Sequence, residues 1–223
     1  LEAVANMRLD LVKQIHSTGV DINTINESDG RNALMFCTMI PPERADTITS
    51  YKIADYFLSN GACANTINPN GRYTALHFAV STQRLDIIAL LLHSQADLTL
   101  LNNDGDTAFH LACRKDMTAV VQWFIANTPE QVLSQVDSSL KAIQLAQTNH
   151  AYIVFRYLLS VPLIRNQIKQ SSEAVDKLIN ISFHPFDIEA VCQVVKVFHQ
   201  DILKTLSDGL WSLETPYRKQ FEP

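Results

Sequence analysis

Two histidines in this chain stand close to groups with which they could carry out catalysis. His110 lies three residues before Cys113, so the pair could in principle supply the base and the nucleophile of a thiol enzyme. Both residues would lie in one short helix, however, and no third group nearby would orient the imidazole ring. His77 stands in a similar stretch earlier in the chain. We expect no nucleophilic catalysis at either histidine.

The other candidates for acid–base or metal chemistry have simpler explanations. The stretch HPFD brings His184 near Asp187, but an aspartate at that place can cap the helix that follows it. Asp104 and Asp106 form a carboxylate pair on an exposed polar turn rather than in a cleft. The cysteines are widely spaced and form no C-x-x-C motif, namely Cys37, Cys63, Cys113 and Cys192. Neither a Gly-rich phosphate loop nor an H-E-x-x-H motif occurs, so the sequence predicts no catalytic residue, no metal site and no cofactor.

The histidines belong instead to a pattern that repeats with a period of 33 residues. Identical residues keep this spacing in Thr74 and Thr107, Ala75 and Ala108, His77 and His110, and Ala79 and Ala112. The stretch RLDIIALLLHSQADLT at 84–99 repeats the pattern of RLDLVKQIHSTGVDIN at 8–23, and YKIADYFLSNGACAN at 51–65 is a third version. So many coincidences in register indicate an internal repeat.

Each copy has the features of a turn followed by two helices. The polar turn 104–106 contains glycine and can reverse the chain, and Thr107 can cap the next helix through its hydroxyl. Apolar residues follow at helical spacing, namely Ile87, Ile88, Leu91 and Leu92 in one copy and Val120, Val121, Phe124 and Ile125 in another. Gly19 and Gly61 stand where a second helix would end in a left-handed residue. One helix pair cannot bury its apolar face alone, so the copies must stack into a solenoid.

This pattern resembles the ankyrin-repeat family, whose unit of 33 residues carries the signature T-P-L-H-x-A. The stretches that match the signature are 74–79 and 107–112, and those that match the G-A-D-x-N end of the unit are 19–23, 61–65 and, more weakly, 95–99. The resemblance covers residues 1–160 and implies an all-α solenoid of helix-turn-helix units with extended turns. We expect a partial first repeat, a second repeat with an insertion at about 38–50, two regular repeats and a degenerate last one.

Several positions depart from the family pattern. Ala75 and Ala108 replace the proline of the signature, and Met35 replaces its histidine in the second copy. Gln95 stands where glycine usually closes the second helix, so we expect backbone strain there. The last copy, 138–159, has lost the Thr, Gly and His of the signature but keeps a helical pattern.

After the repeats the 33-residue pattern stops. Pro162 suits the first turn of a helix, 171–181 is typical of a short amphipathic helix, and Asp187 can cap a longer helix over 188–206. We expect residues 161–223 to be either a helical cap on the solenoid or the start of a further domain.

Composition and charge exclude several classes of protein. Of the 223 residues, 47% are hydrophobic and 18% are charged, with a net charge of −5, which is ordinary for a folded domain. No basic stripe would gather nucleic acid, and no window approaches about 18 consecutive apolar residues, so we expect neither nucleic-acid binding nor membrane insertion. Scattered thiols and the lack of a signal peptide favour a cytoplasmic protein. Leu1 falls inside a repeat, which suggests a truncated start.

The resemblance implies protein binding without catalysis. Ankyrin repeats typically bind partners through the turn tips and the exposed side of the first helices, which line a concave groove. The matching positions here are Asp29, Arg31, Asn70, Arg72, Tyr73, Ser81, Thr82, Asn103, Asp104, Asp106, Arg114 and Lys115. Arg72 and Tyr73 are the favoured anchors because Arg and Tyr often dominate interfaces.

We therefore expect a monomeric adaptor or targeting module that binds a partner protein. The insertion at 38–50 is either a second binding element or a plain linker. The alternative is an enzyme in which the repeats read the substrate and the catalytic region is C-terminal or lies elsewhere. The Asn- and Gln-rich, Gly-poor repeats also resemble ankyrin-bearing effectors of intracellular bacterial pathogens, which would act on a host protein in the host cytosol.

Overall fold

The computed structural model describes residues 2–41, 47–133, 136–183, 194–195 and 198. The chain divides into two compact units, residues 1–134 and 135–223. Within the described residues both units consist of helices and contain no strand, which confirms the predicted all-α class.

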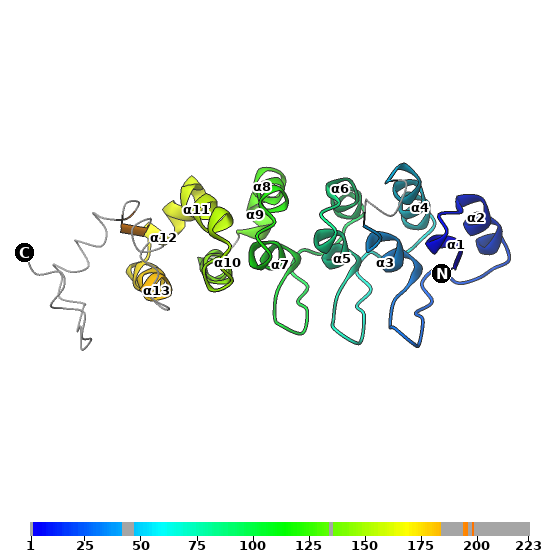
Figure 1. Cartoon of the computed structure of the whole chain (residues 1–223), viewed down its shortest axis with the longest axis horizontal. Helices are drawn as coiled ribbons and strands as arrows, with labels where there is room; N and C mark the ends of the chain where they lie inside the picture. Colours follow the sequence, from blue (N-terminus) through cyan, green and yellow to red (C-terminus); the bar gives the residue numbers. More distant parts are fainter. Residues whose placement is uncertain (1, 42–46, 134–135, 184–193, 196–197, 199–223) are drawn as a thin grey trace, which may run out of the picture. The chain divides into compact units, whose positions relative to one another are not determined.

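The first unit is built from four helix pairs followed by one short helix. Its helices are α1 (Glu2–Ala5), α2 (Leu9–Ser17), α3 (Ala33–Thr38), α4 (Thr47–Ser59), α5 (Ala75–Ser81), α6 (Leu85–His93), α7 (Ala108–Arg114), α8 (Thr118–Asn127) and α9 (Pro129–Val132). The pairs α1–α2, α3–α4, α5–α6 and α7–α8 are repeats 1 to 4. The first helices of the pairs form one row, the inner helices, and the second helices form another, the outer helices (Figure 1). Three loops project beneath the inner row (Figure 1).

Side-chain caps begin the inner helices, as the signature predicts. The hydroxyl of Thr107 accepts a hydrogen bond from the backbone N–H of His110, and the His110 ring reaches back to the backbone N–H of Thr107. This reciprocal arrangement is a capping box, and Thr74 and His77 form a second one. In repeat 2 the side chain of Asn32 caps α3 instead, accepting a backbone N–H at 2.8 Å. The loss of histidine from that repeat therefore leaves its inner helix capped.

Left-handed residues follow the outer helices α2, α4 and α6, as predicted for Gly19 and Gly61. Gly19 follows α2 with a φ angle of +86°, and Gly61 follows α4 with +89°. Gln95 adopts +62° at the equivalent place after α6. Because a residue with a Cβ pays about 1–2 kcal/mol in this region, the predicted strain at Gln95 is confirmed.

Successive repeats bury one another's apolar faces. α1 packs on α3, α3 on α5 and α5 on α7, while α2 packs on α4 and α4 on α6. Two outer-helix positions are almost fully buried in repeats 2 to 4, namely Ile53, Ile87 and Val120 at 0% exposure, and Phe57, Leu91 and Phe124 at 4%, 0% and 0%. This stacking supplies the core that no single pair could form.

The linker between α3 and α4 is longer than the one between α5 and α6. Both ends of this linker are fixed to repeat 3. At the end of α3, the backbone oxygen of Thr38 accepts a hydrogen bond from the Thr82 hydroxyl at 3.0 Å. At the start of α4, Arg84 donates to the backbone oxygen of Thr47 at 3.2 Å and to Ser50 Oγ at 2.8 Å. The insertion therefore leaves the packing of both helices intact.

The second unit contains α10 (Val136–Thr148), α11 (Tyr152–Ser160), α12 (Pro162–Lys169) and α13 (Ser172–Phe183). The predicted degenerate repeat forms the pair α10–α11, and α10 also contacts α12 and α13. The two compact units divide at residues 134–135. The boundary near residue 160, between the repeats and a helical cap or further domain, stays a prediction. Apart from residues 194, 195 and 198, the predicted helix over 188–206 and the tail lie outside the described residues.

Candidate protein-binding surface

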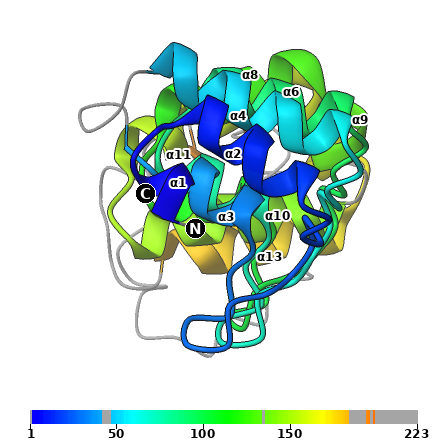
Figure 2. The ribbon, with the colours of Figure 1, turned by 90° about the vertical axis from the view of Figure 1, so that its right-hand side faces the viewer.

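Three finger loops precede the inner helices α3, α5 and α7. Finger 1 is 26–31, finger 2 is 68–73 and finger 3 is 102–106. In each one the backbone N–H of the first residue donates to the carbonyl oxygen of the last, at 2.9, 2.9 and 3.0 Å. Seen along the first unit, the fingers lie in line below the helices (Figure 2). We call the surface formed by the fingers and the adjacent side of the inner helices the finger face.

Hydrogen bonds between neighbouring fingers hold them in register. The side-chain amide of Asn68 donates to the backbone oxygen of Asp29 in finger 1 at 3.0 Å. The backbone N–H of Asn103 donates to the backbone oxygen of Gly71 in finger 2 at 3.0 Å. The fingers are therefore positioned by one another as well as by the helices that follow them.

In finger 2 the glycine does not occupy the left-handed position of the loop. The left-handed residues of fingers 1 and 3 are Gly30 and Gly105, with φ angles of +70° and +73°. In finger 2 this conformation falls on Arg72, at +57°, and not on Gly71. A Cβ on Gly71 would lie 2.7 Å from the ring of Tyr73, so the glycine makes room for that ring to fold back across the finger.

An arginine–aromatic cluster joins repeats 2 and 3 on the finger face. The Arg31 guanidinium lies 5.5 Å from the centre of the Phe78 ring, and the Tyr73 ring lies 5.6 Å from it. Asp29 pairs with Arg31 at 3.7 Å, and each of these two side chains is 31% exposed. Arginine and aromatic residues that are fixed but partly exposed are the kind that dominate protein interfaces.

In finger 3 the predicted site residues bind one another. Arg114, at the end of α7, pairs with Asp104 at 3.0 Å and also with Asp106. Asp106 is 0% exposed, whereas the Asp104 side chain is 51% exposed. Asp106 therefore fixes finger 3 to α7 and offers a partner no surface of its own, while Asp104 and part of Arg114 remain accessible.

The remaining predicted residues lie at the surface with different degrees of exposure. The exposed ones are Asn70, Arg72, Asn103 and Lys115, and the half-buried ones are Tyr73, Ser81 and Thr82. The Thr82 hydroxyl is already engaged with Thr38 of repeat 2, as described above. No ion pair involves Arg72 or Lys115 among the described residues.

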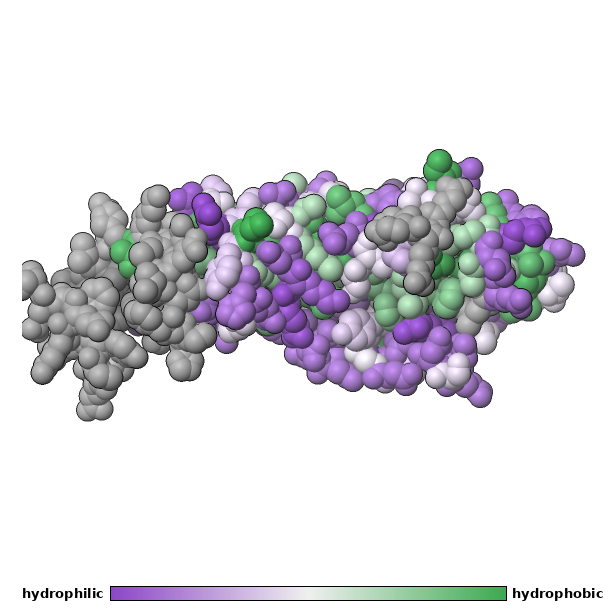
Figure 3. All heavy atoms as spheres, viewed as in Figure 1, coloured by the Kyte–Doolittle hydropathy of each residue, from purple (hydrophilic) through white to green (hydrophobic). Residues whose placement is uncertain are grey.

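The finger face changes in chemistry from one repeat to the next. Contacts of Phe78 and Arg114 with the fingers show that these two inner-helix positions point toward the fingers. The Phe78 position holds Phe36, Phe78 and Leu111 in repeats 2, 3 and 4, and the Arg114 position holds Met39, Ser81 and Arg114. The residue that follows the Arg114 position is Ile40, Thr82 or Lys115. At the Arg114 position and the residue that follows it, the side chains are therefore apolar in repeat 2, small and polar in repeat 3, and charged in repeat 4, whereas the Phe78 position is apolar in all three repeats. In Figure 3 the hydrophilic residues of the first unit gather along its lower edge, where the fingers project.

Our sequence analysis missed the apolar members of this face. Phe36, Met39, Ile40 and Phe78 are half-buried, and apolar helix residues are normally assigned to the core. The positions of Met39 and Ile40 are occupied by polar residues in repeats 3 and 4, so an alignment of the repeats indicates that these two sites lie at the surface, whereas the Phe36 and Phe78 position is apolar in repeats 2 to 4 and gives no such signal.

His77 has a structural role that crosses repeats. Its Nδ1 accepts from the backbone of Thr74, and its Nε2 lies 3.2 Å from the backbone oxygen of Asp106. This geometry assigns the proton to Nε2. Burial lowers the pKa of His77 below its ordinary value, although the carbonyl and charge of Asp106 act in the opposite direction. A neutral ring thus ties repeat 3 to finger 3.

The buried thiols are held in their protonated form. Burial raises the pKa of Cys37 to about 12, and burial together with the Asp106 charge raises the pKa of Cys113. Neither group is therefore a thiolate nucleophile at neutral pH. Across the described ranges, no group of three or more His, Cys, Asp or Glu residues could hold a metal ion. None of the helices in the described part is long and apolar enough to cross a membrane.

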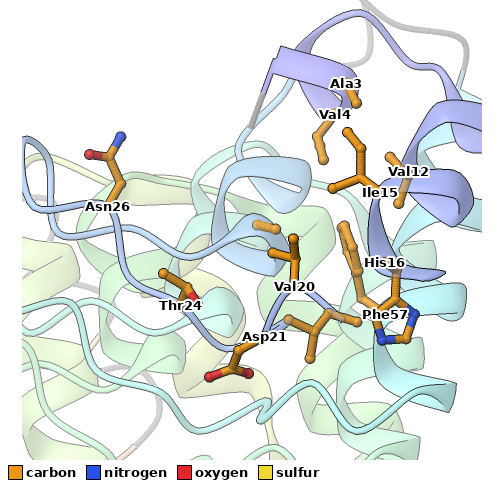
Figure 4. A pocket seen from close by; sticks show the side chains of 12 residues that line it. Ala3, Val4, Val12, Ile15, His16, Val20, Asp21, Thr24, Asn26 and Phe57 are labelled. Atoms are coloured by element: carbon orange, nitrogen blue, oxygen red, sulfur yellow. The ribbon is translucent and has the colours of Figure 1, made fainter. Parts of the chain in front are cut away.

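A pocket of about 220 Å³ lies between repeats 1 and 2, and none of the predicted site residues lines it (Figure 4). Its walls are mainly apolar and include Val4, Val12, Ile15, Val20 and Phe57. This volume is below the roughly 300–1,000 Å³ of typical small-molecule sites. The pocket therefore suits an apolar side chain better than a substrate or cofactor.

Comparison with known proteins identifies the repeats. Residues 1–102 match the family described as ankyrin repeats, in three copies. The ankyrin repeat protein FPV031 of Fowlpox virus (strain NVSL) is 30% identical over 115 residues, which cover 50% of this chain and 31% of the viral protein. Alpha-latroinsectotoxin-Lt1a of Latrodectus tredecimguttatus is 30% identical over 105 residues, which cover 47% of this chain and 7% of the toxin. Residues 1–102 thus match ankyrin repeats, as predicted, and the chain spans only a minor part of either relative.

Proposed function

We propose that this chain binds a partner protein through the finger face and acts as an adaptor or targeting module. Ankyrin repeats generally mediate protein–protein interactions, and this chain carries them. The observation that carries the proposal is the graded chemistry at the end of the inner helices, from Met39 and Ile40 in repeat 2 to Arg114 and Lys115 in repeat 4. Hydrogen bonds between fingers hold this face rigid, so binding costs little conformational entropy.

The gradation specifies the kind of partner surface that fits. An apolar side chain of the partner would contact repeat 2, and a polar or charged one would contact repeat 4. Packed helices lie about 8–10 Å apart, so two steps along the row cover roughly 20 Å. An extended segment of about six residues spans that length. The partner segment should therefore change from apolar side chains at one end to charged side chains at the other over about six residues.

Substitutions at exposed or half-buried positions of the finger face test this proposal with little risk of unfolding. Met39→Ser/Ile40→Thr gives repeat 2 the residues of repeat 3 and removes the apolar end. Arg72→Gly/Lys115→Ala removes two exposed cations. Arg72→Gly also places glycine at a φ angle of +57°, as in fingers 1 and 3, so it relieves strain. Loss of binding by this variant could not be ascribed to a damaged finger.

The control variant is Lys52→Ala/Gln122→Ala, which changes exposed residues of the outer helices α4 and α8. Each protein would be used to capture partners from a eukaryotic lysate, with quantification by mass spectrometry. We expect a set of proteins that the wild type and the control retain and that both finger-face variants lose at least tenfold. A set that is retained by the finger-face variants and lost by the control would refute the proposal.

Three more specific proposals concern an effector role, an enzyme alternative and the oligomeric state. Cytosolic action on a host protein, as an effector, is supported by the composition of the repeats alone. The enzyme alternative gives the finger face the same binding role and assigns catalysis to a region outside repeats 1 to 4. We propose that the module itself is a monomer without catalysis, which light scattering and assays of the captured partner would test.

A further inference from the structure

Finger 2 differs from its neighbours in how its glycine N–H is bound. In fingers 1 and 3 the N–H of the left-handed glycine donates to the backbone oxygen of the finger's first residue, at 2.8 and 3.0 Å. In finger 2 the left-handed residue is Arg72, and its N–H makes this bond to Asn68, at 2.8 Å. The N–H of Gly71 donates to the side-chain oxygen of Asn68 instead, at 3.3 Å. Among the described residues, no main-chain oxygen accepts from Gly71.

The residue before this glycine has a side-chain amide that is not fixed. Asn70 is exposed, and within the described ranges only its backbone forms hydrogen bonds. Its N–H donates to the side-chain oxygen of Asn68 at 2.8 Å, and its carbonyl oxygen accepts from the side-chain amide of Asn103 at 3.5 Å. The Asn70 side chain can therefore turn toward the N–H of Gly71.

The side-chain amide of Asn70 and the backbone nitrogen of Gly71 can react with each other. Once hydroxide has removed its proton, the Gly71 nitrogen attacks Cγ of Asn70 and closes a succinimide ring. The bond between Cγ and the amide nitrogen breaks, and that nitrogen leaves as ammonia after taking a proton from water. Water then adds to either ring carbonyl, and the ring opens to aspartate or to isoaspartate, in which the main chain runs through Cβ and Cγ. Glycine favours the attack because it has no Cβ beside the nitrogen.

The chain contains a matched Asn-Gly pair whose asparagine side chain is fixed. Asn60 and Gly61 follow α4, and Asn60 is exposed like Asn70. The side-chain amide of Asn60 donates to the backbone oxygen of Tyr56 at 2.7 Å, which holds it against the helix. The N–H of Gly61 donates to a backbone oxygen of the same helix at 3.3 Å. The two pairs therefore share their dipeptide and differ in their hydrogen bonds.

We propose that Asn70 is a site of spontaneous deamidation that alters finger 2. Both products carry a new negative charge. Isoaspartate also adds a main-chain atom between residues 70 and 71, directly before the Gly71 oxygen that accepts from the N–H of Asn103 at 3.0 Å. Formation of isoaspartate therefore weakens the link between fingers 2 and 3. The inference rests on the hydrogen bonds of the two Asn-Gly pairs and is independent of the function proposed for the finger face.

The test is incubation of the purified chain at mildly alkaline pH, followed by peptide mass spectrometry with electron-transfer fragmentation, which distinguishes aspartate from isoaspartate. We expect Asn70 to deamidate about tenfold faster than Asn60 or more, because Asn60 must first break its hydrogen bond to Tyr56. In urea, where neither site is held by the fold, the two asparagines should react at similar rates.

Two variants separate the reaction from its effect on the finger. Asn70→Gln keeps an exposed amide, but its longer side chain closes a ring far more slowly, so the modification at position 70 should disappear while circular dichroism matches the fresh wild type. Asn70→Asp carries the new charge without the added main-chain atom. Hydrogen exchange of the Asn103 amide should therefore be faster in the isoaspartate form than in Asn70→Asp.

Two results would overturn the inference. One is a native chain in which Asn60 deamidates as fast as Asn70, or in which Asn70 stays intact over a time that suffices for reaction in urea. The other is an isoaspartate form in which exchange of the Asn103 amide is the same as in the fresh wild type.

Discussion

The tripeptide Arg-Leu-Asp occurs twice in the first unit, at 8–10 in repeat 1 and at 84–86 in repeat 3. Both copies begin an outer helix, and both close an ion pair of 2.7 Å between the arginine and the aspartate. The side chain of Arg8 is 60% exposed, while that of Arg84 is 5% exposed. The preceding helix α4, which lies against Arg84, accounts for the difference.

This comparison shows that local sequence fixes the geometry of a repeat, whereas its neighbours fix what each contact contributes. An exposed ion pair contributes little, because water screens it and its side chains must be ordered. A buried arginine with several acceptors holds two helices together. Its removal leaves those acceptors without a hydrogen-bond donor. The same reasoning applies to the apolar positions beside each pair.

Truncation of the apolar position should give the largest contrast between the two repeats. We expect Ile87→Ala to lower the free energy of unfolding by about 3 kcal/mol, because it opens a cavity at a fully buried site. Leu11→Ala at the equivalent exposed site should lower it by less than about 1 kcal/mol. Urea unfolding followed by circular dichroism measures both. Equal losses would show that stacking does not set the contribution of this position.

Removal of the arginine should give the next largest contrast. We expect Arg84→Ala to cost about 2 kcal/mol, since the buried Ser50 hydroxyl loses the donor that it has in Arg84. Arg8→Ala should leave the unfolding midpoint unchanged within error. The same urea titration compares the two variants, and a larger loss for Arg8→Ala would contradict the account.

A smaller, pH-dependent effect is expected at His77, which bridges two repeats. Its folded pKa lies below the ordinary value of 6.5, so the unfolded chain binds the proton more readily. The stability contributed by the neutral ring is fully present above that value and is lost as pH falls from 6.5 toward the folded pKa. His77→Gln keeps an acceptor for the capping box but does not titrate. Its thermal midpoint should fall less than that of the wild type between about pH 7 and pH 5, and parallel curves would contradict the assignment.

The smallest effect is expected where a left-handed residue ends an outer helix. Gln95→Gly should raise the free energy of unfolding by about 0.5 kcal/mol, because glycine adopts the φ angle of +62° without strain. Gly61→Gln should lower it by about 1 kcal/mol at a site where a side chain has open space. Thermal unfolding of the two variants would measure this pair, and shifts of the same sign would be inconsistent with backbone strain.

Much of the fold could be predicted from the sequence because it depends on local chemistry. The Thr–His capping boxes, the left-handed helix ends and the long α3–α4 linker all follow from residue types at fixed spacing. The division of the chain could not be predicted in the same way. It depends on which helices pack together. The sequences of α10 and α11 have a helical pattern that would be the same whichever helices they pack against.

The candidate site was predicted only in part, for a similar reason. Asp106 was expected at the surface because it is charged and follows a glycine, but Arg114 allows it to be buried. Phe78 was assigned to no site because it is apolar, yet it anchors the cluster with Arg31. Whether a side chain is exposed depends on partners that are distant in sequence.

The central claim is that partners contact the finger face and not the outer helices. A photocrosslinking amino acid, benzoylphenylalanine, would replace Ser81 on the inner helix α5 in one protein and Gln122 on the outer helix α8 in another. After irradiation in eukaryotic lysate, we expect discrete adducts from position 81 and none from position 122. Adducts from position 122 alone would contradict the claim and move the binding surface to the outer helices.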